Sequence, residues 1–519
     1  MKKMDLKLGA LLMSLVLTVG LIAGCGSSSQ TVARRELVSE EQIESNITSD
    51  ALESATSSDS PTASVSGDSS EKNSTTSSSK VNVNSRVISS ASGNTSSLGT
   101  STNNKGSVTN GTYPPIAKDV MPIGAWVAPP KANISRRNNP SFITDAQYKM
   151  LQESGINMIY GLYELATGDM DDILKSLDLC QKYGIKYLIR DPNLLDADED
   201  TMRKSLERYA SHPAFAGVKV QDEPGTSMFD TFGEMHPIFK KLLPDKYFYI
   251  NLLPSYATPS QWQFGAASTR TDGTMTFTRY LDEYIAKVKP QFLSYDTYSI
   301  HGPKGTVDQV HYKDLSTYRS LSLKHNIPFW VFIQCCGFGS MRRPNEAEIL
   351  WQVNTCLAYG AKGIQYFCYF TPLEDPSAFP GNFIDKDGNK TEIYAYGQKA
   401  NKQIAAVDHV LMNCTSKGII VTGENIDKSL PASDTVTKYG NLSSVTGTGS
   451  GFITGCFDYK GKDAFYVANN SLLNNGDVTL HFSKSVSGTH VYNASSKKFS
   501  GSSLTVSLKA GEGVLIYLD

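Results

Sequence analysis

The feature that most constrains the fold of this chain is a repeated alternation of short β-rich runs with amphipathic helical stretches. It extends from Met121 to Asn413, with one repeat in about 30 to 45 residues. Such alternation is typical of βα units, which build parallel sheets. The strand candidates are eight runs, at residues 121–126, 156–163, 185–190, 215–221, 247–253, 292–298, 328–334 and 363–370.

The segments between these runs carry helix signals. In residues 171–184, Ile173, Leu177 and Cys180 recur at helical spacing, and Gly184 ends the segment. Eight strands with their crossovers in about 300 residues favour a (β/α)8 barrel, because doubly wound open sheets more often stop at about five to seven strands. We expect this barrel at residues 113–413, with its active site at the C-terminal ends of the strands.

The pattern changes near the C-terminus. Apolar residues alternate with polar ones at Val478, Leu480 and Phe482, and again at Val514 and Ile516. Period-two alternation between Gly and Asn turns predicts a small antiparallel β-sandwich at residues 414–519.

The N-terminus predicts export. Basic residues precede an apolar run from Leu8 to Ile22, which is short for a membrane-spanning helix and is followed by Gly24 and Cys25. This stretch resembles a bacterial lipoprotein signal, in which residues 1–25 end at the cysteine that is acylated. The alternative is an ordinary secretory signal with an incidental cysteine. The resemblance implies a protein anchored by lipid at Cys25 on the extracytoplasmic face of the cell membrane.

Residues 26–112 are dominated by Ser, Thr, Asn and Gly, with almost no aromatic residues. A segment of this composition buries too little apolar surface to offset its ordering entropy, so we expect a disordered tether. The formal net charge of −2 and the absence of a long basic block argue against nucleic acid as a partner and favour a neutral ligand. Cysteines lack CxxC spacing and no HExxH or Walker A motif is present, so we expect no metal and no cofactor.

Acidic and amide side chains follow the predicted strands where a barrel would gather them. They are Glu164, Asp191, Asp222, Glu223, Asp296 and Gln334. Aromatic residues accompany them, namely Trp126, Tyr163, Tyr256, Trp262, Tyr295, Tyr298, Phe338, Tyr366 and Tyr369. Carboxylates among aromatic walls suit a sugar ring, whose C–H faces stack on aromatic rings while acids act on the glycosidic oxygen. The competing interpretation is that one acid caps a helix, another pairs with Arg190, and the aromatic residues form the core.

The stretch Asp222–Gly225, "DEPG", resembles the Asn-Glu-Pro that follows the fourth strand in clan A glycoside hydrolases. The runs "YINLLPSYA", "FLSYDTYS", "IPFWVFIQ" and "LAYGAKGIQYFCYF" are also similar to the β-galactosidase-type, family forty-two-like barrels. The resemblance covers Ile116 to Asn413. It implies an oligo- or polysaccharide substrate and Glu223 as the general acid/base.

Two residues depart from the clan A pattern. Asp222 stands where that clan has Asn, and Gln334 stands where it has the nucleophilic Glu at the end of the seventh strand. Because an amide cannot form the covalent glycosyl intermediate, the second catalytic group must come from elsewhere.

Three arrangements remain open. Asp296 is a nucleophile if its carboxyl lies about 5 to 5.5 Å from that of Glu223, and an inverting base at about 6.5 to 9.5 Å. Alternatively, the adjacent Asp222 and Glu223 resemble the pair of substrate-assisted hexosaminidases, in which the Asp orients a 2-acetamido group. Neighbouring residues of a strand point to opposite faces, so both acids reach one site only if the strand breaks there, as Pro224 and Gly225 suggest. We favour Asp296, and we expect burial and like charge to raise the pKa of Glu223.

The sequence thus predicts a membrane-anchored extracellular glycoside hydrolase. The catalytic candidates are Glu223, Asp222 and Asp296. The substrate-binding candidates are Trp126, Glu164, Asp191, Tyr298, Gln334 and Tyr366. The alternative is a catalytically inactive, glycan-binding surface lipoprotein. The closing segment "LKAGEGVLIYLD" resembles accessory domains that follow glycosidase barrels, and such a domain either binds carbohydrate or packs against the barrel. The sequence makes no prediction of the oligomeric state.

Overall fold

The computed structural model describes residues 116–134, 138–304, 307–308, 310–423 and 434–519. All of them belong to one compact unit. The predicted signal peptide, the lipidation site Cys25 and the predicted tether lie outside the described residues.

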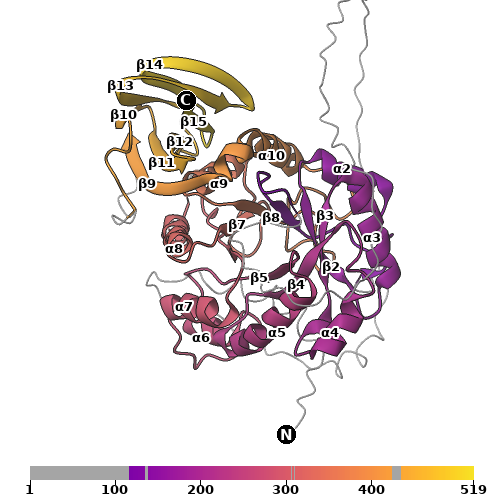
Figure 1. Ribbon diagram of the computed structural model, residues 1–519. Helices are drawn as coiled ribbons and strands as arrows, with labels where there is room; N and C mark the ends of the chain where they lie inside the picture. Colours follow the sequence, from indigo (N-terminus) through magenta and orange to yellow (C-terminus); the bar gives the residue numbers. More distant parts are fainter. Residues whose placement is uncertain (1–115, 135–137, 305–306, 309, 424–433) are drawn as a thin grey trace, which may run out of the picture. The chain divides into compact units, whose positions relative to one another are not determined.

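Eight parallel strands form a barrel (Figure 1), as the alternation predicts. They are β1 Ile123–Trp126, β2 Met158–Leu165, β3 Lys186–Arg190, β4 Phe215–Asp222, β5 Tyr247–Asn251, β6 Leu293–Asp296, β7 Phe329–Gln334 and β8 Gly363–Phe367. They pair in the order β5-β4-β3-β2-β1-β8-β7-β6. Between β5 and β6 a bridge joins Leu252 to Tyr295, and the Leu252 N–H donates to the Ser294 carbonyl at 2.8 Å. The ring of strands is therefore nearly closed, and the predicted (β/α)8 fold is confirmed.

The helices lie around this ring in Figure 1. They are α2 Asp145–Glu153, α3 Met170–Tyr183, α4 Glu199–Leu206, α5 Phe229–Leu242, α6 Pro259–Phe264, α7 Phe277–Val288, α8 Val310–His325, α9 Glu346–Ala358 and α10 Glu392–Leu411, with short 3-10 turns η4 Pro192–Leu194 and η5 Thr226–Met228. Helix α3 buries Ile173, Leu177 and Cys180 and ends at Gly184, whose φ of 69° is left-handed. The apolar residues of α3 are therefore buried and Gly184 ends the helix, as the sequence predicts.

The C-terminal region is an antiparallel sheet in the order β10-β13-β15-β12-β11-β9, with β14 on β13. Its strands are β9 Cys414–Gly423, β10 Leu442–Thr448, β11 Gly451–Tyr459, β12 Lys462–Asn469, β13 Gly476–Tyr492, β14 Ser495–Leu508 and β15 Gly513–Leu518. The first half of β13 pairs with β10 and the second half with β15. Strands β10 and β9, at opposite ends of the order, are in contact. The sheet thus closes around its own core, which includes Phe452, Phe465 and Leu480.

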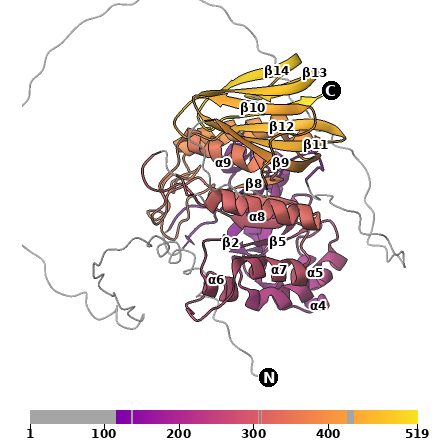
Figure 2. The same ribbon diagram turned by 90° about the vertical axis from the view of Figure 1, so that its left-hand side faces the viewer.

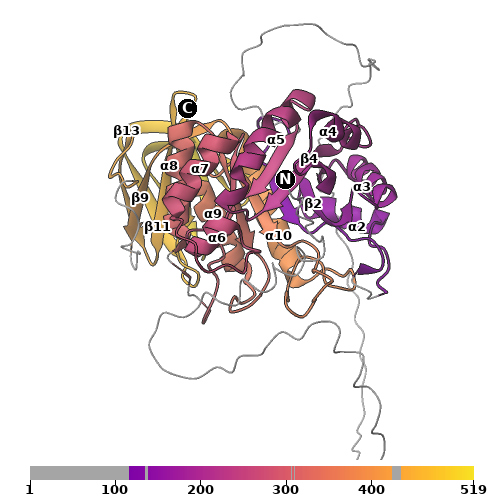
Figure 3. The same ribbon diagram turned by 90° about the horizontal axis from the view of Figure 1, so that it is seen from below.

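Helix α9 packs against both the barrel strand β7 and the C-terminal strands β11 and β12 (Figure 2). Asn354 of α9 donates to the Gly511 carbonyl at 2.8 Å and accepts from the Tyr466 hydroxyl at 2.7 Å. Every residue from Glu348 to Ala358 is buried. A helix covered on both sides has no solvent face, and the polar side chains of Gln352, Asn354 and Thr355 are accordingly hydrogen-bonded within the protein. Figure 3 shows the same contact from below, with α8 and α9 beside the C-terminal strands.

Candidate active site

The site begins where β4 ends. Asp222 is the last residue of the strand, and Glu223 after it has a φ of 44°, in the left-handed region. The Glu223 N–H donates to the Asn251 carbonyl at 2.9 Å, and its carbonyl accepts from the Ala266 N–H at 3.0 Å. Because the backbone turns at this residue, the side chains of both acids line one cavity. The expected break in the strand is confirmed, and a strained conformation at such a position is typical of functional sites.

Gly225 allows the turn to pack closely. A Cβ added at this residue would lie 2.3 Å from the backbone nitrogen of Gly265, directly after α6. Only glycine permits this approach, so the loop that carries Glu223 is pressed against the segment that follows α6.

The acids open into a cavity of about 600 Å³, which we call the inner cavity. Its walls come from every barrel strand except β3 and from the loops after β6, β7 and β8. The lining residues are Trp126, Tyr160, Lys219, Asp222, Glu223, Tyr249, Asn251, Asp296, Tyr298, Phe332, Phe338, Phe367 and Phe379. The charged and amide groups lie on β4, β5 and β6, whereas β7, β8, their loops and β1 contribute aromatic rings. A cavity with one polar and one aromatic side matches the two-sided surface of a sugar ring.

The aromatic side is continuous. The ring of Trp126 stacks on that of Phe367, with centroids 5.4 Å apart and planes at 27°. Phe338 lies edge-on to both Tyr298 and Phe367, at 5.1 and 5.3 Å. Phe379 is 5.8 Å from Phe367. These five rings come from β1, from β8 and from the loops after β6, β7 and β8, which only the closed barrel brings together.

Glu223 and Asp296 form a coupled pair on the polar side. Burial raises the pKa of Glu223 well above its ordinary value, and the nearby charges of Asp296 and Asp222 raise it further. Burial also raises the pKa of Asp296, which is 3% exposed, but the hydrogen bond from Glu223 works in the opposite direction. Because burial and the neighbouring charges disfavour the ionisation of both acids, the pair retains a proton at a pH where an isolated carboxyl group would have lost it.

Asn251 orients Asp296 from below. Its Nδ2 donates to Asp296 Oδ1 at 3.2 Å, and its Oδ1 accepts from the Ser294 hydroxyl at 3.0 Å. The Ser294 oxygen in turn accepts from Gln365 Nε2 at 3.0 Å. This chain of bonds connects the barrel interior to the acid, fixes which way the Asn251 amide points, and lowers the pKa of Asp296.

Lys219 is a site residue that sequence reasoning missed. Its Nζ lies 3.4 Å from Asp222 Oδ2 and 4.4 Å from the centre of the Trp126 ring. Burial lowers the pKa of this lysine. The register between β4 and β5 shifts at Lys219 and Gln221, and this bulge puts residues three apart on one side of the strand. The sequence signal that could have identified Lys219 is its position as a charged residue within the mostly apolar run of β4.

Other lining residues escaped prediction for a different reason. Asn251 and the aromatic residues Phe332, Phe367 and Phe379 read as core positions of strands and loops. Nothing in their local sequence separates a cavity wall from a packed interior.

Of the predicted substrate-binding residues, Trp126 and Tyr298 line the inner cavity. Glu164, Asp191, Gln334 and Tyr366 do not. Tyr366 donates its hydroxyl to Asn401 of α10 at 2.7 Å, because alternation along β8 turns Gln365 inward and Tyr366 outward.

Glu164 and Asp191 have structural partners instead. Glu164 accepts from the Lys131 N–H at 2.8 Å, and burial raises its pKa to about 7. Asp191 caps η4 by accepting from the Asn193 N–H at 3.0 Å, and it also accepts from the Tyr209 hydroxyl at 2.7 Å. Both acids hold loops in place, and neither lines the inner cavity.

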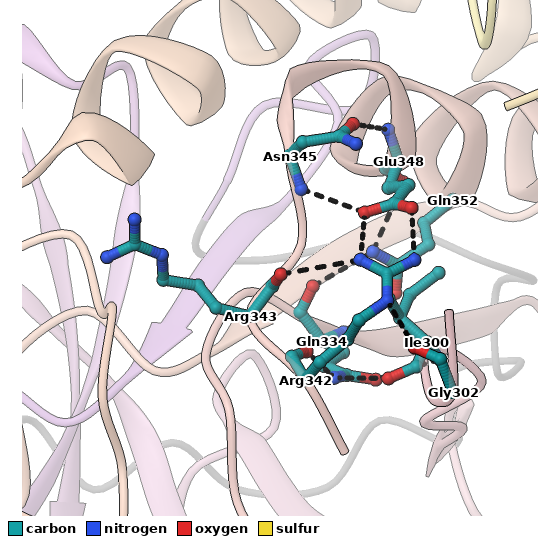
Figure 4. A network of polar contacts seen from close by, with 8 residues as sticks. All are labelled: Ile300, Gly302, Gln334, Arg342, Arg343, Asn345, Glu348 and Gln352. Atoms are coloured by element: carbon teal, nitrogen blue, oxygen red, sulfur yellow. Dashed lines mark hydrogen bonds and ion pairs between the residues drawn. The ribbon is translucent and has the colours of Figure 1, made fainter. Parts of the chain in front are cut away.

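Gln334 likewise stabilises loops, as Figure 4 shows. Its Nε2 lies 3.1 Å from the Ile300 carbonyl, 3.3 Å from that of Cys336 and 2.7 Å from that of Arg342. Its Oε1 accepts from the Ile300 N–H at 3.0 Å. Arg342 is held in turn by a two-fold contact with Glu348, one branch at 2.7 Å. An amide fits this position because three carbonyl groups face its nitrogen, and Gln334 does not line the inner cavity.

A second cavity, of about 690 Å³, adjoins the first, and we call it the outer cavity. It shares Glu223, Asp296 and Tyr298 with the inner cavity. Its remaining walls are Leu253, Pro254, Tyr256, Ala257, Gln261, Asp308, Ser340 and Met341, on the segments after β5, β6 and β7.

Within the described residues, no three His, Cys, Asp or Glu side chains are arranged to hold a metal ion. In the same part of the chain, none of the helices combines the length and the hydrophobicity needed to cross a bilayer.

No protein-family model matches the chain, and no curated protein matches it either. Solved structures give distant likenesses. A β-galactosidase from the psychrophilic Marinomonas ef1 is 11% identical, with a TM-score of 0.41 over 58% of this chain and 63% of that one. A family 5 glycoside hydrolase from Bacteroides vulgatus is 11% identical, with a TM-score of 0.45 over 77% and 89%. An exo-β-1,4-mannosidase from an Opitutaceae bacterium is 13% identical, with a TM-score of 0.39 over 56% and 60%. These named structures are glycoside hydrolases, but likenesses at this level establish no function, which we infer from the cavity residues themselves.

Proposed function

We propose that the protein is a glycoside hydrolase that cleaves O-glycosidic bonds with Glu223 as general acid/base and Asp296 as nucleophile. One observation carries the proposal: Glu223 and Asp296, two acids whose pKa values are raised by burial and by nearby charge, lie together in the wall of a cavity whose other side is aromatic. A buried acid that stays protonated near neutral pH, beside a carboxylate, is the pair that glycoside hydrolysis requires.

In the first step, Glu223 gives its proton to the glycosidic oxygen. The bond between that oxygen and the anomeric carbon breaks, and Asp296 forms a bond to the anomeric carbon from the opposite face. Asp296 is suited to this role because the Asn251 amide donates to its carboxyl group and lowers its pKa. The aromatic wall excludes water while positive charge develops on the sugar ring.

In the second step, the Glu223 carboxylate takes a proton from water, and the oxygen of that water attacks the anomeric carbon. The bond to Asp296 breaks, and the proton taken from water leaves Glu223 protonated again. The net reaction adds one water molecule across the glycosidic bond and restores the original protonation of the pair.

The spacing of the pair favours the retaining mechanism. An inverting enzyme holds its carboxyl groups about 6.5 to 9.5 Å apart to leave room for water, whereas a retaining enzyme holds them about 5 to 5.5 Å apart. Here the two carboxyl groups lie close enough for each to shift the pKa of the other. The retaining class, with the shorter separation of its carboxyl groups, is therefore the nearer match. In this arrangement the glycosidic oxygen of the substrate binds between Glu223 and Asp296.

Asp222 and Lys219 form an ion pair at the rim of the polar side. We propose that their role is electrostatic: the Asp222 charge raises the pKa of Glu223, and Lys219 limits that rise. The ion pair between Asp222 and Lys219 does not support a role of Asp222 in substrate-assisted hydrolysis.

The test is a panel of p-nitrophenyl glycosides in both anomeric forms, assayed with the wild type, Glu223→Gln and Asp296→Asn. We expect both variants to lose at least about a thousandfold in kcat on the sugar that the wild type cleaves. The exposed Asp282→Asn on α7 serves as the matched control and should match the wild type. A 2-deoxy-2-fluoro glycosyl fluoride of that sugar should label Asp296, and proton NMR should show the first product with retained configuration.

A wild type that is inert on the whole panel and on natural oligosaccharides would refute the enzyme assignment. Tight binding of an oligosaccharide that stays intact would then favour the glycan-binding protein.

We also propose that the protein is held on the extracytoplasmic face of a membrane by acylation of Cys25. The support is the sequence resemblance alone, since Cys25 lies outside the described residues. Metabolic labelling with a fatty acid should mark the wild type and not Cys25→Ala. Equal labelling of both would contradict the anchor.

A further inference from the structure

A buried chain of hydrogen bonds runs through the barrel interior and ends at Asp296. Its members come from three strands: Gln365 from β8, Ser294 and Asp296 from β6, and Asn251 from β5. Gln365 donates to Ser294 at 3.0 Å, Ser294 to Asn251 at 3.0 Å, and Asn251 to Asp296 at 3.2 Å. Each of the four side chains belongs to a residue that is 3% exposed or less. Because bulk solvent does not reach these groups, they must satisfy one another.

We infer that Gln365 is a positioning residue of the proposed reaction: acting through Ser294 and Asn251, its amide keeps a hydrogen-bond donor directed at Asp296. Gln365 is not among the residues that line the inner or the outer cavity, so its effect on the reaction is indirect. The inference rests on the proposed function for the role of Asp296, whereas the chain of bonds can be tested without it.

The direction of the chain is set at Gln365. The hydroxyl groups of Tyr160 and Tyr249 both donate to its Oε1, the second at 2.8 Å. A glutamine side chain has one acceptor oxygen and one donor nitrogen. Since two hydroxyl groups occupy the oxygen, the nitrogen is the atom that faces Ser294.

This direction passes along the chain. The Ser294 hydroxyl has a single proton, and because its oxygen accepts from Gln365, the proton is available to Asn251 Oδ1. The acceptor atom of Asn251 is thereby turned toward Ser294, and its donor atom toward Asp296. In the reverse orientation the Asn251 oxygen would face the carboxylate, and two acceptors would repel each other in a buried site.

The barrel interior leaves room for the first bond of this chain. Gly124 of β1 pairs with Gln365 in the sheet register. A Cβ added to this glycine would lie 2.8 Å from the Tyr160 hydroxyl and 3.2 Å from Gln365 Cγ. Any larger residue would therefore press on both partners, in an interior that is close-packed.

Asp296 also faces titratable groups outside the chain. Besides Glu223 they are Asp222 at the end of β4, Tyr256 and Tyr298 on the loops after β5 and β6, Tyr295 of β6, Tyr280 of α7, and Asp314 and Tyr318 of α8. All of these groups are kept in the variants below. A change in the pKa of Asp296 therefore reports on the chain.

The first experiment measures the pKa of Asp296 from the carbon NMR signal that Asp296→Asn removes from protein with labelled aspartate. Gln365→Met keeps the length of the side chain and takes away the donor to Ser294. We expect it to raise the pKa of Asp296 by about half a pH unit or more, because the donor that favours the carboxylate is no longer held in place. In the Asn251→Ala background the same change should have almost no effect, since the chain is already interrupted.

Gln352→Met is the matched control. Gln352 is also a buried amide, but it lies on α9 and bonds to the backbone of Gln334 and Glu348. Its loss should destabilise the fold without moving the pKa of Asp296. An unchanged pKa in Gln365→Met, or an equal rise in the Asn251→Ala background, would overturn the inference.

The second experiment uses the wild type and needs no folded variant of Gln365. As the pH is changed, the side-chain amide signals of both Asn251 and Gln365 should move, with the midpoint measured for Asp296. Movement of the Asn251 signal alone would show that the chain does not reach Gln365, and it would overturn the inference.

Neither measurement requires hydrolysis. A wild type that is inert on every glycoside would refute the proposed function and leave the coupling of Gln365 to Asp296 standing. An active wild type whose Asp296 keeps its pKa in Gln365→Met would refute this inference alone. Where both hold, the acidic limb of the pH profile of kcat/KM in Gln365→Met should move by the same amount as the pKa of Asp296.

Discussion

At the scale of single residues, Asn251 is the side chain that sets the state of Asp296. Its amide donates to the carboxylate at 3.2 Å and is itself oriented by Ser294. A bond to the charged form favours ionisation, so its loss should raise the pKa of Asp296. Asn251 does not supply a reacting atom in the proposed mechanism and acts through Asp296, which makes it a positioning residue.

We predict that Asn251→Ala moves the acidic limb of the pH profile of kcat/KM to higher pH. Asp296 must be a carboxylate to act, so a raised pKa means that activity is lost earlier as the pH falls. The alkaline limb reports Glu223, which must stay protonated, and should move less. Ser294→Ala removes the hydroxyl that contacts Asn251, Gln365 and Tyr249 but leaves the bond from Asn251 to Asp296 in place, so it should give a smaller shift in the same direction. An unchanged acidic limb in Asn251→Ala would contradict the positioning role.

A second prediction concerns Gln334, because changing it to Glu gives the residue that clan A hydrolases have at this position. The carboxylate would face the carbonyls of Ile300, Cys336 and Arg342 in place of an N–H donor. We predict that Gln334→Glu lowers the free energy of unfolding by about 1 to 3 kcal/mol at neutral pH and does not raise activity. Urea unfolding measures the loss, with the exposed Gln152→Glu on α2 as control. A variant more active than the wild type would show that the side chain reaches the cavity.

At the scale of elements, the end of β4 determines where the acid points. Glu223 adopts a left-handed φ, its backbone bonds to the last residue of β5 and to the segment after α6, and Gly225 packs against Gly265. The strand, the turn and α6 thus position one side chain together. Such a turn tolerates little displacement, since the proton donor must meet the glycosidic oxygen within hydrogen-bonding distance.

We predict that Gly225→Ala lowers kcat at least about tenfold and also destabilises the fold, because the new Cβ would lie 2.3 Å from the Gly265 nitrogen and force the loops apart. Gly168→Ala is the matched control, since a Cβ there meets nothing within 4 Å. The two variants should be compared by kcat and by thermal unfolding. Wild-type values for Gly225→Ala would mean that the turn is not under this constraint.

At the scale of the whole molecule, the described barrel and the C-terminal sheet share buried polar contacts. Arg319 of α8 donates to Asp434 at 2.7 Å and to the Ser416 hydroxyl of β9 at 2.8 Å. The ion pair is buried, because the Arg319 side chain is 7% exposed and that of Asp434 is 4% exposed. Contacts of this kind, together with the enclosed α9, indicate that the two regions stabilise each other.

We predict that Arg319→Met lowers the free energy of unfolding by about 3 to 5 kcal/mol, because it leaves the Asp434 carboxylate buried without its partner. Arg279→Met breaks the exposed pair with Glu283 on α7 and should cost less than about 1 kcal/mol. Hydrogen exchange should show protection lost together in α8 and β9. Loss in β9 alone would indicate that the regions unfold independently.

The sequence by itself determined the barrel and the place of its site. The eight strands appear within a few residues of their predicted bounds, since apolar periodicity and glycine stops are local properties. It also placed Asp222, Glu223 and Asp296 at strand ends. Only the tertiary structure decided which of the strand-end groups meet. Glu164, Asp191 and Gln334 turn to loops, and Lys219 and Asn251 enter the cavity, because side-chain direction depends on a bulge, a left-handed turn and the partners that burial supplies. These are contacts between distant segments, which no local pattern encodes.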